Sequence, residues 1–438
     1  MLATEDGAHG DGVICGRGRI HNKPVALYAY DFSIQGGSLS EKNSKKIVHT
    51  MQTALRFNCP IISLMDSCGA RISDSVDALV GYGNILRTNV ELGGKVPQIS
   101  IILGVAAGGA SYSSALQDLV LMGRNNSYMF STGPDVVATS VGEATSKDEL
   151  GGPFVHGTQS GLVHLVCDTE LQTLRAARCA LHYLPQNSQR TPPCTVFVDK
   201  GLQTHLRTCI PVDMDEPYDV KPIIQDLVDQ FSFFELSPTY ATNIVTGFAR
   251  VGGYSVGVVA NQPCHLAGCL TSDAAIKASS FLQLCSRYNL PIITFVDVPG
   301  AIVGTEAEVH GCSRHIVQLL RSYVQASNVL KITVTLRKSY GGGHIAMASK
   351  QIGAQIHYAW PTAQFAIFSA SCYARIMLRN EPIEVQQSKS LEYCERFLTP
   401  LLAARRGYID DIIDPATTRT RLIQDLNFYY FDTQHHSS

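Results

Sequence analysis

The sequence predicts an α/β fold made of two related domains in tandem, and two observations lead to this prediction. Short β-branched or continuously apolar runs alternate with stretches whose apolar residues recur at helical spacing, which is typical of parallel strands covered by helices. In addition, the second half of the chain repeats motifs of the first half in the same order. Self-similarity over so long an interval indicates two duplicated domains rather than a solenoid, which needs three or more shorter units.

The repeat is clearest where a strand runs into a glycine turn. Strand, aspartate and turn recur at one constant interval in the pairs 56–62 and 287–293, Asp66 and Asp297, and Gly69-Ala70 and Gly300-Ala301. At nearly the same interval, residues 96–102 lead into Gly108-Gly109 as residues 329–336 lead into Gly341-Gly342-Gly343. A third pair, Gly16 and Gly247, lies in the expected first strand of each half.

Composition excludes several classes of protein. The 438 residues allow two to three domains, and 45% hydrophobic with 16% charged residues is ordinary for a soluble enzyme. The formal net charge of −2, without a Lys/Arg run, argues against nucleic acid or an anionic membrane as a bulk partner. The longest apolar runs, such as residues 99–110, are too short and glycine-rich to span a bilayer.

Targeting and cysteine usage indicate a cytoplasmic protein. Residues 1–6 lack a basic region followed by an apolar stretch, so we expect no secretory signal. The 13 cysteines read as reduced and mostly buried small hydrophobes. Cys264 and Cys269 have no second pair at zinc-ligand spacing, and His435-His436 alone makes a poor metal site, so we expect no bound metal.

The elements can be placed from the patterns in chain order. In the first half we expect strands at 12–15, 24–31 and 60–65, helices at 41–57, 71–89 and 110–117, and a helix start near residue 134. In the second half we expect a hairpin at 247–260, a helix at 273–288, and strands at 291–296 and 332–336. Residues 184–237, rich in proline, amides and acidic residues, are interpreted as the inter-domain segment, and we divide the chain into domains 1–200 and 201–438.

Backbone amides at the glycine turns are the candidate chemistry. Glycines between a strand and a helix most often serve tight packing, but they also let an anionic oxygen approach unblocked N–H groups. If adjacent strands carry Gly69-Ala70 with Gly108-Gly109, and Gly300-Ala301 with Gly341-Gly342-Gly343, each pair of turns can form an oxyanion hole from main chain alone. Two such holes imply two carbonyl oxygens.

A resemblance to a known family rests on motifs in order along almost the whole chain. These are Asp11-Gly12-Val13, Gly36-Gly37, residues 66–72, 107–110, 132–136, 259–263, 295–300, 340–342 and 359–363. Together they resemble the carboxyltransferase (β) subunit of biotin-dependent acyl-CoA carboxylases, the propionyl-CoA carboxylase group in particular. The resemblance implies two tandem crotonase-like (ClpP/crotonase) domains, in agreement with the repeat.

The resemblance also implies roles for the turns. Acyl-CoA is expected on the N-terminal domain, with its thioester oxygen held by amides of Ala70, Gly108 and Gly109, beside Gly69. Carboxybiotin, carried by a separate protein, is expected on the C-terminal domain, with its carbonyl held near Gly342 and Gly343, beside Gly300 and Gly341. In this family carboxybiotin gives up CO2, the biotin nitrogen removes the α-proton of the acyl-CoA, and the enolate attacks CO2.

Partners follow from the same likeness. The chain has neither a biotinyl-lysine motif of the Met-Lys-Met type nor an ATP-dependent half, so it is expected to need a biotin carboxylase and a biotin carboxyl carrier protein. Family sites form between opposite halves of two subunits in a ring-shaped homo-hexamer, a trimer of dimers.

Several positions depart from the family pattern. Cys68, Thr271, Gly343 and Gln364 replace a usual glycine, aspartate, alanine and glutamate, and residues 368–373 replace a Met-Gly-Ala-x-Gly-Ala run. Ile345 stands where propionyl-specific members tend to have aspartate, a position associated with the choice of acyl chain. Most of these changes lie on the biotin-binding half.

Side chains near the turns allow more than one interpretation. Asp66 and Asp297 are catalytic acids or, more commonly for such residues, strand-end caps of the next turn. His344 and His310 polarise the carboxybiotin or take part in ordinary polar packing. Arg71 reaches a CoA phosphate or is an exposed arginine at a helix start.

The alternatives to a carboxyltransferase are a biotin-independent decarboxylase of acyl-CoA or acyl-carrier thioesters and a catalytically degenerate scaffold paralogue. The decarboxylase needs the oxyanion hole of the N-terminal half, whereas the scaffold needs neither of the two oxyanion holes.

Overall fold

The computed structural model describes the backbone of residues 10–435 and the side chains of residues 10–431. The expectations for residues 1–6 and for the terminal histidine side chains fall outside these limits. The chain divides into two compact units. Unit 1 runs through Pro192 and includes Ser237–Tyr240, whereas unit 2 comprises Pro193–Leu236 and the chain from Ala241 onward.

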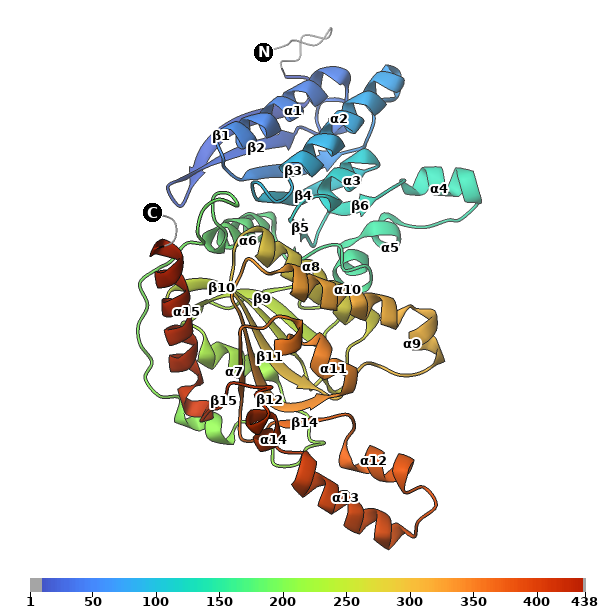
Figure 1. Ribbon diagram of the computed structural model, residues 1–438. Helices are drawn as coiled ribbons and strands as arrows, with labels where there is room; N and C mark the ends of the chain where they lie inside the picture. Colours follow the sequence, from blue (N-terminus) through green and yellow to red (C-terminus); the bar gives the residue numbers. More distant parts are fainter. Residues whose placement is uncertain (1–9, 436–438) are drawn as a thin grey trace. The chain divides into compact units, whose positions relative to one another are not determined.

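Unit 1 contains a mixed sheet and six helices within its described residues (Figure 1). Its strands are β1 (Val13–Ile20), β2 (Lys23–Tyr30), β3 (Ile61–Ser67), β4 (Gln98–Ala107), β5 (Leu119–Gly123), β6 (Tyr128–Phe130) and β7 (Leu165–Cys167). Its helices are α1 (Glu41–Arg56), α2 (Val76–Leu92), α3 (Gly109–Ala115), α4 (Pro134–Val141), α5 (Lys147–Gly151) and α6 (Glu170–Tyr183).

Unit 2 is built on a second sheet. Its strands are β8 (Phe234–Leu236), β9 (Ile244–Val251), β10 (Tyr254–Asn261), β11 (Ile292–Val298), β12 (Lys331–Tyr340), β13 (Ile356–Ala359), β14 (Gln364–Ala366) and β15 (Asp411–Ile412). Its helices are α7 (Val220–Leu227), α8 (Ser272–Arg287), α9 (Thr305–Val309), α10 (Cys312–Gln325), α11 (Gly341–Ala346), α12 (Ala370–Met377), α13 (Ile383–Phe397), α14 (Pro400–Arg405) and α15 (Thr418–His435).

The two sheets are connected in the same order. The first runs β1-β2-β3-β4-β5-β7 with β6 beside β4, and the second runs β8-β9-β10-β11-β12-β13-β15 with β14 beside β12. In each, a hairpin is antiparallel and the following strands are parallel. The α/β class with two sheets is therefore confirmed, and β8 is an additional edge strand of the second sheet.

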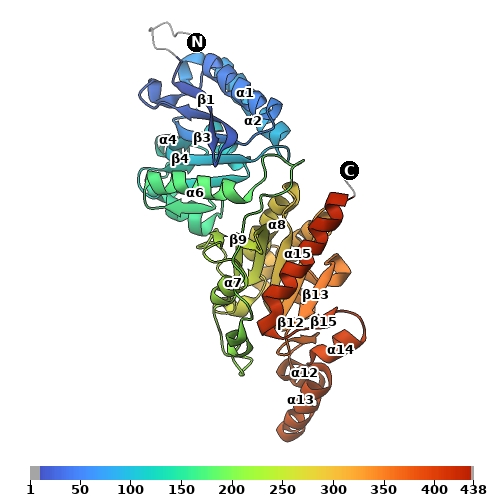
Figure 2. The same cartoon turned by 90° about the vertical axis from the view of Figure 1, so that its left-hand side faces the viewer.

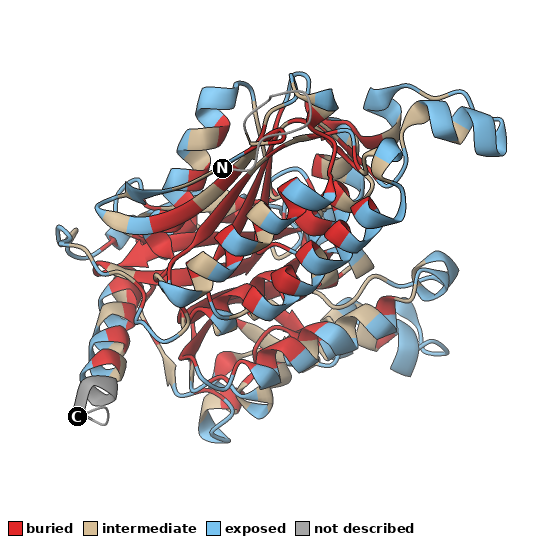
Figure 3. Ribbon diagram, turned by 90° about the horizontal axis from the view of Figure 1, so that it is seen from above, coloured by how far each residue is buried: buried red, intermediate tan, exposed pale blue. Residues whose placement is uncertain are grey.

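Helices cover each sheet through apolar faces. In unit 1, α1 is fixed at its start by a capping box between Ser40 and Asn43, and it buries Ile47, Met51 and Ala54 against the sheet. Helix α6 packs on β4 and β5 (Figure 2). In unit 2, α15 buries Leu422 and Leu426 in the cluster formed by β9 to β12. The strands are mostly buried and the outer faces of the helices are exposed (Figure 3).

An aspartate carboxylate lies at the point where each central pair of strands loses register. The β3/β4 register shifts between Met65 and Ser67, and the β11/β12 register shifts between Val296 and Val298. Asp66 Oδ1 accepts the Val105 N–H at 3.0 Å, and Asp297 Oδ1 accepts the Lys338 N–H at 3.0 Å. The carboxylates thus bond to the neighbouring strand rather than to the next turn.

The surroundings of the two carboxylates differ. A side chain at Gly104 would meet Asp66 Oδ1 at 2.0 Å, so only glycine fits there. In the second sheet Arg337 lies at the corresponding position, donates from Nε to Asp297 Oδ2 at 2.9 Å, and is 3% exposed beside an Asp297 that is 1% exposed. Burial raises the pKa of both carboxyls, and the Arg337 charge opposes this effect at Asp297 alone of the two.

The inter-domain interpretation of residues 184–237 is wrong for most of that segment. Helix α7 contributes Val220, Ile223, Ile224 and Leu227 to the core of unit 2, and β8 joins its sheet. Most of the prolines and acidic residues of the segment lie in the loops around this helix, whereas Pro222 and Asp226 lie within it, and together they masked its short apolar periodicity.

The cysteine expectation is also wrong in part. All the cysteines lie within residues 10–435 and are free, but full burial is limited to Cys59, Cys285 and Cys312. In the same part of the chain, no helix is long and apolar enough to cross a membrane. No group of three or more His, Cys, Asp or Glu side chains among these residues is arranged to hold a metal ion.

Removing one partner of the buried pair of Asp297 and Arg337 should destabilise unit 2. Asp297→Asn leaves a buried guanidinium without its counter-charge, and we expect a loss of about 3–5 kcal/mol in the free energy of unfolding. Urea denaturation followed by circular dichroism measures it. Glu41→Gln, which removes the exposed pair with Lys45, is the control and should change little. Equal effects of the two changes would contradict this assignment.

Candidate active site at the glycine turns

In unit 1 the structure brings the two predicted turns together. Leu39 lies beside Ala70, donating its N–H to the Gly69 carbonyl at 2.8 Å and accepting the Arg71 N–H at 2.9 Å. Because these bonds flank Ala70, its own N–H points to the opposite side of the chain, where it has no acceptor among the described residues. A side chain on Gly69 would meet the Ala107 carbonyl at 3.2 Å, so this turn lies against the end of β4.

The second turn of unit 1 depends on glycine geometry. Gly108 has φ 59° and ψ −127°, a conformation that L side chains rarely adopt, and α3 begins directly after it. The N–H groups at the first turn of a helix have no partner within the helix. The amide of Gly109 is therefore available beside Ala70, on the adjacent strand end. The Gly108 N–H instead donates to the Phe130 carbonyl at 3.1 Å, so the expected role of the Gly108 amide at the thioester oxygen gains no support.

Tyr82 on α2 holds this turn in place and was not identified from the sequence. A Cβ atom on Gly109 would lie 2.4 Å from Tyr82 Cδ1, so the ring packs directly on the glycine. The hydroxyl is buried and has no hydrogen-bond partner among the described residues. Burial raises the pKa of Tyr82 to about 12, which keeps the phenol neutral. Tyr82 has the helical spacing of an ordinary core residue, and this spacing does not predict a contact with Gly109.

Unit 2 repeats the arrangement. Leu270 donates to the Gly300 carbonyl at 3.0 Å and accepts the Ile302 N–H at 2.9 Å, so Ala301 is flanked as Ala70 is. A Cβ atom on Gly343 would lie 3.2 Å from Gly300 Cα and 2.8 Å from Val298 Cγ2, which places the turns in contact. Gly342 is exposed, and no described atom lies within 4 Å of the position that its Cβ would take.

His344 belongs to a partly buried aromatic cluster beside this turn. Its Nδ1 bonds to Ser339 Oγ at 2.9 Å, and its ring packs on His357 and Phe365. Burial lowers the pKa of His344, so the ring is neutral near pH 7. His310 is exposed and bonds through Nδ1 to the Glu306 carbonyl at 2.8 Å. These contacts are polar packing, and they give no support to a cationic role.

Arg71 does not match the exposed helix-start interpretation. Its side chain is 11% exposed and pairs with Asp11, 3% exposed, at 2.8 Å, and it also donates to Ser38. The alternative of a contact to a CoA phosphate gains no support, because the guanidinium is engaged inside unit 1. Ile345, by contrast, is exposed on α11, two residues beyond Gly343.

A cavity of about 690 Å³ borders the turns of unit 2. It is lined by residues that precede the turns, Pro299 and Tyr340, by the acidic loop at Asp215, and by α12 and α13. Lys338 and Gln364 also line it. Of the run 368–373 that departs from the family motif, residues 368–372 thus lie in the wall of this cavity.

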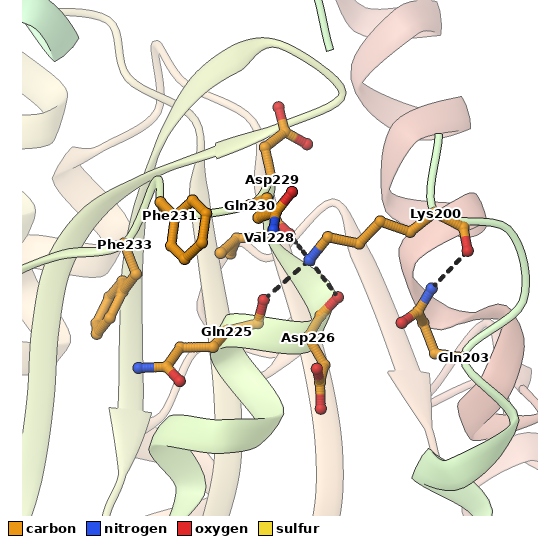
Figure 4. Close-up of a pocket in the computed structure, with 9 residues that line it drawn as sticks. All are labelled: Lys200, Gln203, Gln225, Asp226, Val228, Asp229, Gln230, Phe231 and Phe233. Carbon is orange, nitrogen blue, oxygen red and sulfur yellow. Dashed lines mark hydrogen bonds between the residues drawn. The ribbon is translucent and has the colours of Figure 1, made fainter. Parts of the chain in front are cut away.

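A larger cavity, of about 810 Å³, lies elsewhere in unit 2 (Figure 4). Lys200 points into the end of α7 and donates to the carbonyls of Gln225, Asp226 and Val228, at 3.2, 3.4 and 2.8 Å. These bonds satisfy carbonyls that the helix leaves without partners. The cationic charge therefore serves the helix end, and the cavity is not lined by any of the glycine turns.

Comparison with known proteins decides the family. The model of the carboxyl transferase domain matches residues 2–436. The chain belongs to this family. It is 44% identical over 425 residues to the propionyl-CoA carboxylase carboxyltransferase subunit of Haloferax mediterranei, covering 95% of this chain and 82% of the relative. It is 42% identical over 422 residues to the methylmalonyl-CoA decarboxylase subunit alpha of Veillonella parvula, covering 95% and 82%.

A solved structure is similar over the same extent. The crystal structure of transcarboxylase 12S, a hexamer with methylmalonyl-coenzyme A and methylmalonic acid bound, superposes with a TM-score of 0.93 at 43% identity. The match covers 96% of this chain and 82% of that chain. The carboxyltransferase class predicted from the ordered motifs is therefore confirmed.

Because Tyr82 packs on Gly109, substitutions at these two positions should have non-additive effects on the free energy of unfolding. Gly109→Ala overpacks this contact and should destabilise unit 1 by about 1–3 kcal/mol. In a Tyr82→Ala background the same change should cost much less, because the ring has gone. Urea denaturation of the single and double variants measures both values. Gly83→Ala on α2, where a Cβ meets no described atom within 4 Å, should leave stability unchanged or raise it. Additive costs at Gly109 and Tyr82 would contradict the packing.

Buried histidine should make unit 2 sensitive to acid. Burial lowers the pKa of His357 to about 3, so the unfolded chain binds the proton more tightly than the folded one. Stability is then lost as pH falls from about 6.5 toward 3, by up to about 1.4 kcal/mol per pH unit. Denaturation midpoints of His357→Gln should show a flatter pH dependence in this window. An unchanged slope in His357→Gln would refute the prediction.

Proposed function

We propose that this chain is the carboxyltransferase subunit of a biotin-dependent acyl-CoA carboxylase, built from two crotonase-like domains. One observation carries the proposal, namely that both units place an N–H that has no acceptor among the described residues, at Ala70 and Ala301, beside a glycine turn on the adjacent strand. In this proposal acyl-CoA binds the N-terminal domain, residues 1–200, and carboxybiotin binds the C-terminal domain, residues 201–438.

The turns of unit 1 supply the means to form an enolate. We assign the amides of Ala70 and Gly109 to the thioester oxygen, with Gly69 and Gly108 shaping the turns. Negative charge develops on this oxygen when the α-proton leaves, and each well-aimed donor contributes on the order of 3 kcal/mol to lowering the barrier. Such a hole needs no charged side chain, which agrees with the uncharged surroundings at Tyr82 and Gly109.

Biotin on a carrier protein suits the turns of unit 2. We assign its ring carbonyl to the amides at Ala301, Gly342 and Gly343, beside Gly300 and Gly341, where the open space at Gly342 permits close approach. When bound, the carboxylated ring supplies CO2. His344 and Ile345 then flank the site as a neutral donor or acceptor and as an exposed apolar residue that bears on acyl-chain choice.

The assembly is part of the proposal. We infer a cytoplasmic homo-hexamer, a trimer of dimers, in which unit 1 of one subunit faces unit 2 of its partner, working with a biotin carboxylase and a biotin carboxyl carrier protein. The hexameric 12S structure supports it at 43% identity. The substrate is a short acyl-CoA, and propionyl-CoA is suggested by the names of the relatives.

A second candidate is decarboxylation of a malonyl-type thioester. The Veillonella relative carries that activity in its name, and the same hole in unit 1 serves both directions. A scaffold without activity is the remaining alternative.

Reconstitution tests the proposal. The full chain is mixed with a biotin carboxylase, a biotinylated carrier, ATP, labelled bicarbonate and acetyl-, propionyl- and butyryl-CoA. We expect acid-stable label on one or more acyl-CoAs, lost at least tenfold in Gly109→Ala and kept in Gly83→Ala. No label on any acyl-CoA would refute the proposal. CO2 release from methylmalonyl-CoA without biotin would favour the second candidate, and inactivity in both assays would favour the scaffold.

A further inference from the structure

The cavity that borders the turns of unit 2 contains a cation whose pairing is weak. Lys338 lies three residues before Gly341, and its side chain lines the cavity and is 12% exposed. Its backbone is fixed, because its N–H donates to Asp297 Oδ1 at 3.0 Å. Its charge acts on another wall of the same cavity, since it opposes the effect of burial, which raises the pKa of the Cys269 thiol.

The partner of this cation is almost entirely in water. Lys338 Nζ lies 3.1 Å from Asp215 Oδ1, and the Asp215 side chain is 95% exposed. An ion pair with one partner so exposed contributes little net stability, because water screens it and solvates the free carboxylate well. The ammonium group can therefore exchange Asp215 for another carboxylate at small cost.

The acidic loop is nevertheless held at this place. Arg337, beside Lys338, donates from Nη1 to the carbonyls of Asp213 and Glu216 at 3.3 and 2.8 Å. Asp215 lies between these two anchored residues, so its carboxylate stays within reach of Lys338 while its backbone is fixed. The Asp215 carboxylate is therefore positioned to compete with an incoming carboxylate for Lys338.

Neutral hydrogen-bonding groups lie next to Lys338 in the cavity. Gln364 pairs in register with Lys338, and the Tyr340 hydroxyl donates to Gln364 Oε1. Burial raises the pKa of Tyr340 well beyond neutrality, so the phenol keeps its proton. The carboxamide nitrogen of Gln364 still has donors to offer, since no described residue accepts from it. A cation beside amide donors suits a carboxylate attached to a urea-like ring.

We propose that this cavity receives the carboxylated end of carboxybiotin, that Lys338 binds its carboxylate, and that Asp215 is the competitor displaced. The inference rests on the proposed function and deepens it, because it names a positively charged residue for the anionic group. It also makes the affinity for the carboxylated ring depend on an exposed loop that the glycine turns do not include.

Transfer from labelled carboxybiotin tests the role of Lys338. Free biotin is carboxylated by a biotin carboxylase with ATP and labelled bicarbonate, and initial rates of transfer to acyl-CoA are measured over a range of carboxybiotin concentrations with the full chain. Lys338→Met should raise the KM for carboxybiotin about tenfold or more, because a charge-assisted hydrogen bond is lost. The KM for acyl-CoA should stay within about twofold, and Lys338→Arg should recover part of the loss.

Two further variants keep the test independent of folding. Asp215→Asn, at an exposed side chain, should lower the KM for carboxybiotin by about two- to fivefold, since the competitor has gone. Lys350→Met removes a matched lysine, which pairs with Asp410 at 2.6 Å with side chains 30% and 37% exposed, and should change neither KM. Thermal unfolding of each variant reports its folded fraction.

The outcomes separate this inference from the proposed function. Transfer by the unmodified chain with equal KM values in Lys338→Met and Lys350→Met overturns the inference and leaves the function standing. An increase in the KM for carboxybiotin in Asp215→Asn also overturns it. Absence of transfer by the unmodified chain to every acyl-CoA overturns both.

Discussion

At the centre of each sheet, an aspartate carboxylate takes the place of a backbone carbonyl. Asp66 and Asp297 accept the N–H groups of Val105 and Lys338, where the neighbouring strand has extra residues that the ladder cannot pair. Without that acceptor, each partly buried N–H would be unsatisfied, at a cost of about 1 kcal/mol or more. The bulge lets the two strands end side by side, and the glycine turns follow from these ends. The position of both candidate holes therefore depends on one hydrogen bond in each sheet.

The two halves satisfy the same constraint with different neighbours. Gly104 leaves room for the Asp66 carboxylate, whereas Arg337 at the corresponding place pairs with Asp297 and also anchors the carbonyls of Asp213 and Glu216. Arginine in place of glycine at this position thus joins the sheet of unit 2 to a loop, and Gly104 makes no such link among the described residues of unit 1. The two halves thus differ in the strands that lead into the glycine turns, at Gly104 and Arg337.

Residue periodicity and glycine spacing predicted several helices, strands and turns but missed helix α7 and the contacts between neighbouring strands. The helix at 41–57, the strand at 60–65 and the paired glycine turns follow from periodicity and glycine spacing, and α1, β3 and the turns lie there. Helix α7 was missed because its few apolar residues lie among prolines and acidic loops. The assignment of Asp66 and Asp297 as turn caps missed the acceptor role, because residue spacing along one strand does not reveal the register of the next.

Contacts between distant segments account for the remaining differences. Arg71 was interpreted from its position at a helix start, but its charge is paired with Asp11, sixty residues earlier, at 2.8 Å. Tyr82 has the ordinary spacing of a core residue, and nothing in the sequence indicates that its ring covers Gly109. Such contacts depend on packing in three dimensions, which hydrophobic periodicity does not encode.

Gly342 differs from the other glycines at the turns. The close approach of Ala107 to Gly69 and of Tyr82 to Gly109 means that packing requires glycine there, but a methyl group at Gly342 would touch no described atom. Glycine inside a helix is less favourable than alanine by about 1 kcal/mol. The first turn of α11 is thus weaker than it needs to be for folding alone. A substitution that filled this position would therefore raise thermal stability and, at the same time, narrow the approach to the backbone.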